Sequence, residues 1–180
     1  MAADAELSRS TRRRLLATTL ALAAWGAGCS MFAPKPPPPP PPPPPKPPPP
    51  PPPKLAIRIV AAPGLNPDIR GRASPVVVRV YELKSTAPFD AADFMSLYAQ
   101  DRTVLGGELV AREELVLEPG ETKAIGKLLA PEVRGLAVVA AFRDIERAQW
   151  RAAVSLVPGR DNALTVSLDE LAVRIQPTRP

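Results

Sequence analysis

The 180-residue chain contains no histidine and a single cysteine, Cys29. Without histidine, neither a Ser-His-Asp triad nor a mixed Cys/His metal site can form, and one cysteine cannot make a disulfide within the chain. Aromatic residues make up only 4% of the sequence, and they do not alternate with basic residues as in proteins that stack nucleic-acid bases. These absences argue against several common hydrolytic, zinc-binding and nucleic-acid-binding functions.

Carboxylates, lysine and tyrosine are the remaining candidates for catalysis, and none forms a clear site. Asp144 and Glu146 follow Arg143 at the end of an expected strand, where we interpret them as part of a solvated turn. Asp90 and Asp93 stand near the start of an expected helix, where negative charge is favourable in any case. We therefore predict that the protein is not an enzyme and needs no metal or cofactor.

Residues 1–28 have the pattern of a lipoprotein signal peptide. Three arginines precede an uncharged apolar run at residues 15–27, which is shorter than the roughly 20 residues that a membrane-spanning helix needs. Small residues then lead to Cys29, which resembles the sequence cut by the lipoprotein signal peptidase. We predict that lipid on the Cys29 thiol anchors the mature chain, since several acyl chains together hold a protein in a bilayer.

Two further features bear on the destination of the chain. The arginines also resemble a twin-arginine signal, so export by that route or by the general secretory route stays open. Ser30 follows the cysteine in place of the aspartate that commonly retains lipoproteins at the inner membrane. We therefore expect an outer-membrane location.

Residues 29–53 form an expected linker after the lipidated cysteine, and 18 of the 20 residues from 34 to 53 are proline. Proline fixes φ near −65° and lacks a backbone N–H, which excludes an α-helix or a sheet strand and leaves the polyproline II conformation. At a rise of about 3.1 Å per residue, the 20 residues would extend over roughly 60 Å. The segment is either a spacer that lifts the domain off the lipid surface or a ligand for a proline-binding groove. Its position between anchor and domain favours the spacer.

Residues 54–180 have the strand patterns of an all-β domain. Apolar residues alternate with period two near positions 55–59, 150–156 and 164–168, while residues 76–84 are rich in β-branched side chains and residues 109–117 also carry strand signals. Residues 135–142 are apolar on both faces, which predicts a central strand. The segment 89–100 fits a short helix. About eight short strands predict a β-sandwich of two antiparallel sheets packed face to face, with one short added helix.

Several segments carry a resemblance to a known family: residues 75–83, Phe89, 92–94, 97–98, Asp101, 105–106, 117–120, 136–144 and 150–151. Their order and spacing, after a lipobox-like cysteine, resemble the TssJ family, also called SciN or VasD. The resemblance extends over most of residues 55–176. It implies a transthyretin-like β-sandwich with an added helix, on an outer-membrane lipoprotein of the type VI secretion system that faces the periplasm. It also implies that the protein holds the TssJ-TssL-TssM complex by binding the carboxy-terminal periplasmic domain of TssM.

The loop between the first two strands is a main contact with TssM in this family. Here that loop maps onto residues 62–74, and the implied contact residues are Leu65, Asn66, Asp68, Ile69, Arg70 and Arg72. Exposed loops on a rigid sandwich are common binding sites, and arginine is favoured at interfaces. In an alternative arrangement, Leu65 and Ile69 fold back onto the edge of the sheet.

Two other functions stay open at this point. A transthyretin-like binding module would hold a small ligand between its sheets, but the inward positions are large and apolar enough to fill the core. In a stalked, cell-wall-associated lipoprotein, the proline segment rather than the β-domain would carry the function. We favour an assembly component with TssM and outer-membrane lipid as partners, and with no nucleic acid or small-molecule substrate.

Overall fold

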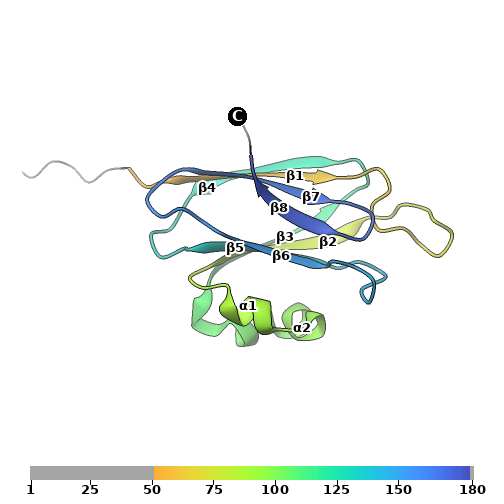
Figure 1. Cartoon of the computed structure of the whole chain (residues 1–180), viewed down its shortest axis with the longest axis horizontal. Coiled ribbons are helices and arrows are strands. Elements are labelled where there is room, and N and C mark those ends of the chain that lie inside the picture. Colours follow the sequence, from red (N-terminus) through yellow and green to blue (C-terminus); the bar gives the residue numbers. More distant parts are fainter. Residues whose placement is uncertain (1–50, 179–180) are drawn as a thin grey trace, which may run out of the picture. The chain divides into compact units, whose positions relative to one another are not determined.

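The computed structural model describes residues 51–178, and the eight strands in this range form two four-stranded sheets (Figure 1). In sheet A the strand order is β4-β1-β7-β8, and in sheet B it is β3-β2-β5-β6. The strands are β1 (Lys54–Ala61), β2 (Val76–Leu83), β3 (Leu109–Leu117), β4 (Thr122–Leu128), β5 (Gly135–Ala140), β6 (Arg151–Ser155), β7 (Asn162–Leu168) and β8 (Val173–Pro177). The predicted two-sheet sandwich is confirmed.

The core between the sheets comes directly from the alternating sequence. Leu55, Ile57 and Ile59 of β1 are 2% exposed or less, and they face Val78 and Val80 of β2 across the interior. Burying one such aliphatic side chain stabilises the fold by about 1.5–3 kcal/mol relative to leaving it in water. The sandwich is therefore held mainly by apolar packing between its two inner faces.

Strand β5 is buried along its whole length, as its sequence predicts. It lies between β2 and β6 in sheet B, so it has a hydrogen-bonded neighbour on each side. Leu136 and Val138 point into the core between the sheets, whereas Ala137 and Val139 lie under the helical layer on the other face. A strand covered on both faces has no need for polar residues, which explains its apolar composition.

One strand pair departs from the expected antiparallel arrangement. β1 pairs antiparallel with β4 but parallel with β7, over seven register positions from Leu55–Asn162 to Ala61–Leu168. Strands far apart in sequence can pair in either direction, and alternation within a strand does not specify its neighbour. Both β1 and β7 consequently begin at the same end of the sandwich.

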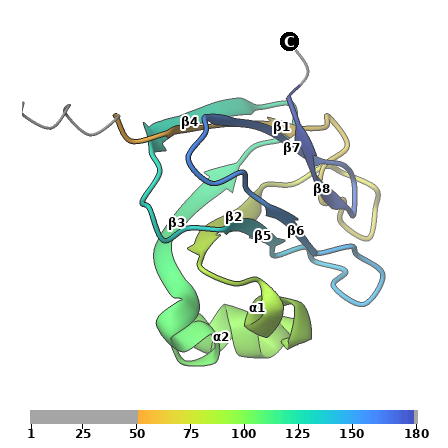
Figure 2. The ribbon, with the colours of Figure 1, turned by 60° about the vertical axis from the view of Figure 1, so that its left-hand side comes forward.

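The added helical segment covers the outer face of sheet B as two short helices (Figure 2). α1 (Ala87–Ala91) and α2 (Phe94–Leu105) replace the single helix expected at 89–100, and a 3₁₀ turn, η1 (Gly106–Glu108), follows them. Ala92 is extended, and Asp93 caps α2 by accepting a hydrogen bond from the Ser96 N–H at 2.9 Å. The break arises because a new helix start at Asp93 supplies a partner for otherwise unpaired N–H groups.

A second, smaller core lies between these helices and sheet B. Phe89, Leu97 and Leu105 from the helices are buried against Tyr81 and Leu83 of β2. Within residues 51–178, no helix is both long and apolar enough to cross a membrane. The described residues also contain no cluster of carboxylate or thiol ligands placed to hold a metal ion.

Candidate functional site

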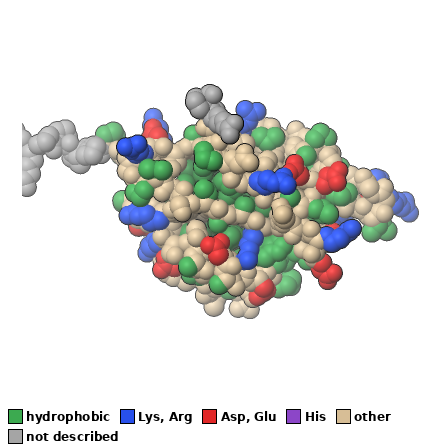
Figure 3. Space-filling model, viewed as in Figure 1, with side chains coloured by type: hydrophobic (Ala, Val, Ile, Leu, Met, Phe, Trp, Pro, Cys, Tyr) green, Lys and Arg blue, Asp and Glu red, His purple; other side chains and the backbone are tan. Residues whose placement is uncertain are grey.

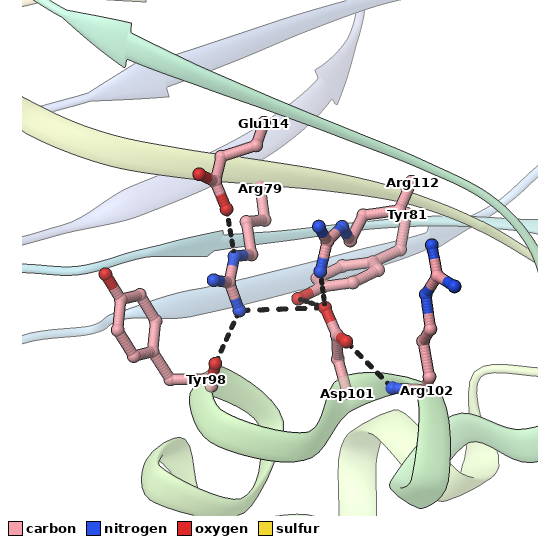
Figure 4. Close-up of polar contacts among 7 residues, drawn as sticks. All are labelled: Arg79, Tyr81, Tyr98, Asp101, Arg102, Arg112 and Glu114. Atoms are coloured by element: carbon pink, nitrogen blue, oxygen red, sulfur yellow. Dashed lines mark hydrogen bonds and ion pairs between the residues drawn. The ribbon is translucent and has the colours of Figure 1, made fainter.

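A cluster of polar side chains joins α2 to sheet B (Figure 4). At its centre, Asp101 of α2 is 5% exposed and accepts hydrogen bonds from Arg112 Nη1 at 2.8 Å and from the Tyr81 hydroxyl at 3.2 Å. Arg79 donates from Nε to Glu114 at 2.6 Å and from Nη1 to the Tyr98 carbonyl oxygen at 2.7 Å. The Asp101 carboxylate, the Tyr81 hydroxyl and the guanidinium groups of Arg79 and Arg112 are therefore all used within the fold.

The electrostatics of this cluster also indicate a structural role. Burial opposes ionisation of Asp101, but the hydrogen bond and positive charge of Arg112 outweigh it and hold the Asp101 pKa below its ordinary value. Burial, reinforced by the negative charge of Asp101, raises the pKa of Tyr81 to about 12. A neutral phenol and an ionised, fully engaged carboxylate pin the helix to the sheet and leave no poised acid or base at neutral pH.

A more suitable surface lies at the end of the sandwich where β1 stops and β2 begins (Figure 1). Four loops meet there: residues 62–75, 118–121, 141–150 and 169–172. The Gly120 N–H donates to the Ala62 carbonyl oxygen at 3.2 Å, and the Asn66 N–H donates to the Glu170 carbonyl oxygen at 2.9 Å. Backbone hydrogen bonds between loops give this end a defined shape.

Two of the sequence-predicted contact residues support the loop from inside. Leu65 has no exposed surface and belongs to the core between the sheets, and Asn66 is 2% exposed. In the described structure neither residue offers exposed surface to a partner, although both were expected to contact one. Leu65 folds back onto the core since burying its apolar side chain is favourable, as the alternative arrangement had it.

Asn66 connects two loops. Its side-chain Oδ1 accepts from the Arg143 N–H at 2.8 Å, and its Nδ2 donates to the Pro75 carbonyl oxygen at 2.7 Å. The backbone of Asn66 has φ 48°, the left-handed region that asparagine tolerates better than most residues. One amide side chain thereby closes the base of the 62–75 loop and fixes the start of the 141–150 loop against it.

The outer half of the first loop is built around Asp68. Its carboxylate accepts from the Arg70 N–H at 2.8 Å, from the Arg72 N–H at 3.0 Å and from Arg72 Nε at 2.8 Å. These bonds, first those from Arg72, hold the pKa of Asp68 below its ordinary value. Asp68 and Arg72 are therefore occupied in shaping the turn.

Ile69 and Arg70 remain as the free side chains of the first loop. Ile69 is fully exposed at the tip, and the Arg70 guanidinium has no carboxylate within 4.0 Å among residues 51–178. The space-filling view shows basic, acidic and apolar side chains close together on this projecting end (Figure 3). Together they give this tip one apolar and one basic side chain that are available to a protein partner.

The 141–150 loop lies beside the first loop and was not predicted to take part in a site. The two loops line a shallow hollow of about 750 Å³, with Pro67 and Ile69 on one wall and Arg143, Ile145 and Arg147 on the other. The sequence contains one signal that links them. Each loop has an Asp-Ile pair followed by an arginine, at residues 68–72 and at residues 144–147.

Comparisons with known proteins agree with this architecture. Residues 53–171 match a family model described as "Type VI secretion lipoprotein, VasD, EvfM, TssJ". The crystal structure of the T6SS lipoprotein TssJ1 from Pseudomonas aeruginosa is 38% identical, with a TM-score of 0.70, and the match covers 72% of this chain and 99% of that one. No curated protein matches the sequence.

Two further solved structures are similar at lower identity. A chain from a structure described as a type VI membrane complex is 26% identical, with a TM-score of 0.61 over 69% of this chain and 98% of that one. A chain from a structure described as the T6SS protein TssM C-terminal domain from EAEC is 25% identical, with a TM-score of 0.58 over the same shares. The family match over residues 53–171, together with the sandwich that those residues form, establishes that the chain belongs to the TssJ family of type VI secretion lipoproteins.

Proposed function

We propose that this lipoprotein is anchored in the outer membrane through Cys29 and binds the carboxy-terminal periplasmic domain of TssM, so that it tethers the type VI secretion membrane complex. The observation that carries the proposal is a rigid loop tip with a fully exposed Ile69 and a free Arg70. Family membership supports the assembly role, and a similar chain occurs in a structure described by the name of the TssM C-terminal domain. Cys29 itself lies outside the described residues.

The direction of the chain supports this arrangement. The described fold begins at β1, whose first residue, Lys54, follows the proline segment. β1 runs for eight residues, about 26 Å, and ends directly at the loop of residues 62–75. A chain anchored upstream of residue 51 would therefore present the loop at the end of the sandwich away from its own point of entry (Figure 1).

The chemistry of the loop tip fits a protein partner. A fully exposed isoleucine loses contact with water when a partner covers it, and an adjacent arginine gives directional hydrogen bonds to carboxylates or carbonyl oxygens. The turn around Asp68 is already ordered by its hydrogen bonds with Arg72, so binding costs little conformational entropy. Such a preorganised tip can bind without refolding.

The alternative of a small ligand between the sheets finds no support in the described domain. The inward residues of β1, β2, β5 and β7 are buried aliphatic side chains in contact with each other. The hollow of about 750 Å³ lies outside the sandwich, between two loops. We therefore keep the assembly role as the proposed function.

A binding measurement tests the proposal. Residues 29–180 are titrated against the purified carboxy-terminal periplasmic domain of TssM, as wild type and as Ile69→Asp. The matched control is Val157→Asp, because Val157 is 53% exposed and lies in the loop between β6 and β7, at the other end of the sandwich. We expect Ile69→Asp to weaken binding at least about tenfold and the control to leave it within twofold. No measurable binding of the wild type would reject the proposal, and equal affinity of all three proteins would reject the loop tip as the contact with TssM.

A further inference from the structure

The hollow between the two loops is a single concave surface with two similarly built walls. Each wall has an exposed or half-buried isoleucine, Ile69 from the first loop and Ile145 from the second. Its volume of about 750 Å³ lies within the range of binding sites and exceeds that of one large side chain. Both ribbon views place the two loops side by side (Figures 1 and 2).

Internal salt bridges order both walls in the same way. Asp68 pairs with Arg72 at 2.7 Å, and Asp144 pairs with Arg147, whose Nε donates to Oδ2 at 2.6 Å. The hydrogen bond from Arg147 holds the pKa of Asp144 below its ordinary value, so both aspartates stay ionised at neutral pH. Each loop thus has an Asp–Arg pair that shapes its turn. In each loop the isoleucine next to the aspartate takes no part in that pair.

The charges at the hollow indicate what it would accept. Arg143 lines it, and its guanidinium has no carboxylate within 4.0 Å among the described residues. The Arg70 guanidinium, at the tip of the first wall, likewise has no carboxylate within 4.0 Å among the described residues. Glu146, which also lines the hollow, has no salt-bridge partner among the described residues either. Two arginines and one glutamate without such partners, beside two isoleucines, favour an apolar side chain in the hollow and an acidic residue placed next to the arginines.

We propose that the 141–150 loop forms the second wall of the TssM-binding site, and that the hollow takes a protruding TssM segment with an apolar side chain next to an acidic one. This inference rests on the proposed function. The hollow adjoins the loop tip, so a protein that covers Ile69 also covers the opening that Ile145 and Arg143 line. We therefore assign the hollow to the same partner. The side chain of Asn66 fixes the spacing of the walls by its hydrogen bond to the Arg143 N–H.

The test uses residues 29–180 and the TssM carboxy-terminal periplasmic domain, with affinity measured by titration calorimetry. Arg143→Glu and Ile145→Asp change only side chains, so the backbone bond from Arg143 to Asn66 stays available. Arg160→Glu is the matched control, since Arg160 is an exposed arginine in the loop at the opposite end. We expect each of the first two to raise Kd at least about tenfold and the control to change it less than twofold. Equal thermal midpoints would show that the variants are folded, and Arg143→Gln replaces Arg143→Glu if the latter is not.

The outcomes separate this inference from the proposed function. If Ile69→Asp weakens binding while Arg143 and Ile145 variants bind as the wild type does, the second wall is rejected and the proposed function stands. If all proteins bind but no variant weakens binding, including Ile69→Asp, both walls are rejected as the contact, and if the wild type does not bind at all, the proposed function fails as well. Self-association of the chain that Ile145→Asp abolishes would assign the hollow to a second copy and overturn the inference.

Discussion

Replacement of Asn66 by alanine tests how the candidate site is held together. The substitution removes two hydrogen bonds, one from the Arg143 N–H to Oδ1 at 2.8 Å and one from Nδ2 to the Pro75 carbonyl oxygen at 2.7 Å. It also places a residue with a Cβ and no polar side chain at φ 48°. Both changes destabilise the folded state.

The size of the effect follows from these two terms. Each lost hydrogen bond costs about 1 kcal/mol, because water can partly replace the missing partner at this end of the domain. The left-handed conformation costs alanine about 1 kcal/mol more than asparagine. Asn66→Ala should therefore lower the free energy of unfolding by about 3 kcal/mol, which lowers the thermal midpoint by about 10 °C.

Urea unfolding of a short variant series separates the terms. Asn66→Gly loses the same hydrogen bonds but tolerates positive φ, so we expect a cost of about 2 kcal/mol. Asn66→Asp keeps the acceptor for the Arg143 N–H but places a buried carboxylate oxygen against the Pro75 carbonyl oxygen, so it should cost more than the glycine variant. A cost for Asn66→Ala below about 0.5 kcal/mol, or a glycine variant as unstable as the alanine variant, would refute the reasoning.

Three other predictions concern the core, the alkaline range and the anchor. Leu65→Ala should lower the free energy of unfolding by about 2–5 kcal/mol because Leu65 is fully buried, whereas Ile69→Ala should change it by less than about 0.5 kcal/mol and weaken TssM binding. Chemical denaturation measures the two stabilities and titration measures the binding. An unchanged stability of Leu65→Ala would contradict the burial of Leu65. The Tyr81 pKa is raised to about 12, so the stability that its neutral form contributes is complete below pH 10 and is lost as the pH rises towards 12. Unfolding measured from pH 9 to pH 12 should show this loss of stability in the wild type and a smaller loss in Tyr81→Phe. An equal loss in both proteins would exclude Tyr81 as its source. Cys29→Ser should move the mature protein from the membrane fraction to the soluble fraction and abolish secretion. Cell fractionation and a secretion assay measure these two effects, and unimpaired secretion by the variant would contradict the lipid anchor.

The strand pattern of the domain was predictable because burial repeats with the geometry of a strand. Leu55, Ile57 and Ile59 alternate with polar or small residues, and one face of a sheet must meet the core. The double-sided apolar run at residues 135–142 predicted a central strand for the same reason. Local periodicity determined these elements, and their neighbours did not need to be known.

Features that depend on distant partners were not predictable in this way. The parallel pairing of β1 with β7 joins residues more than 100 positions apart, and no pattern within either strand specifies it. The break between α1 and α2 depends on the competition between helix continuation and a new cap at Asp93. Element type follows from local sequence more readily than pairing does.

The candidate site shows the same division. Leu65 and Asn66 stand in a polar loop and looked like contact residues, but their environment is set by Glu170 and Arg143 from two other loops. Asp144 fitted a solvated turn from its sequence alone, and only the fold places that turn beside Ile69. The anchor at Cys29 and all but the last three residues of the proline segment lie outside the described residues, and the roles of both stay predictions.

Site-specific photo-crosslinking in cells that assemble the secretion complex tests the central claim most directly. A photoreactive residue is placed at Ile69, at the loop tip, or at Val157, an exposed apolar position at the opposite end of the sandwich. The account predicts a crosslink to TssM from position 69 and none from position 157. A crosslink to TssM from position 157 alone, or none from either position in an active complex, would contradict it.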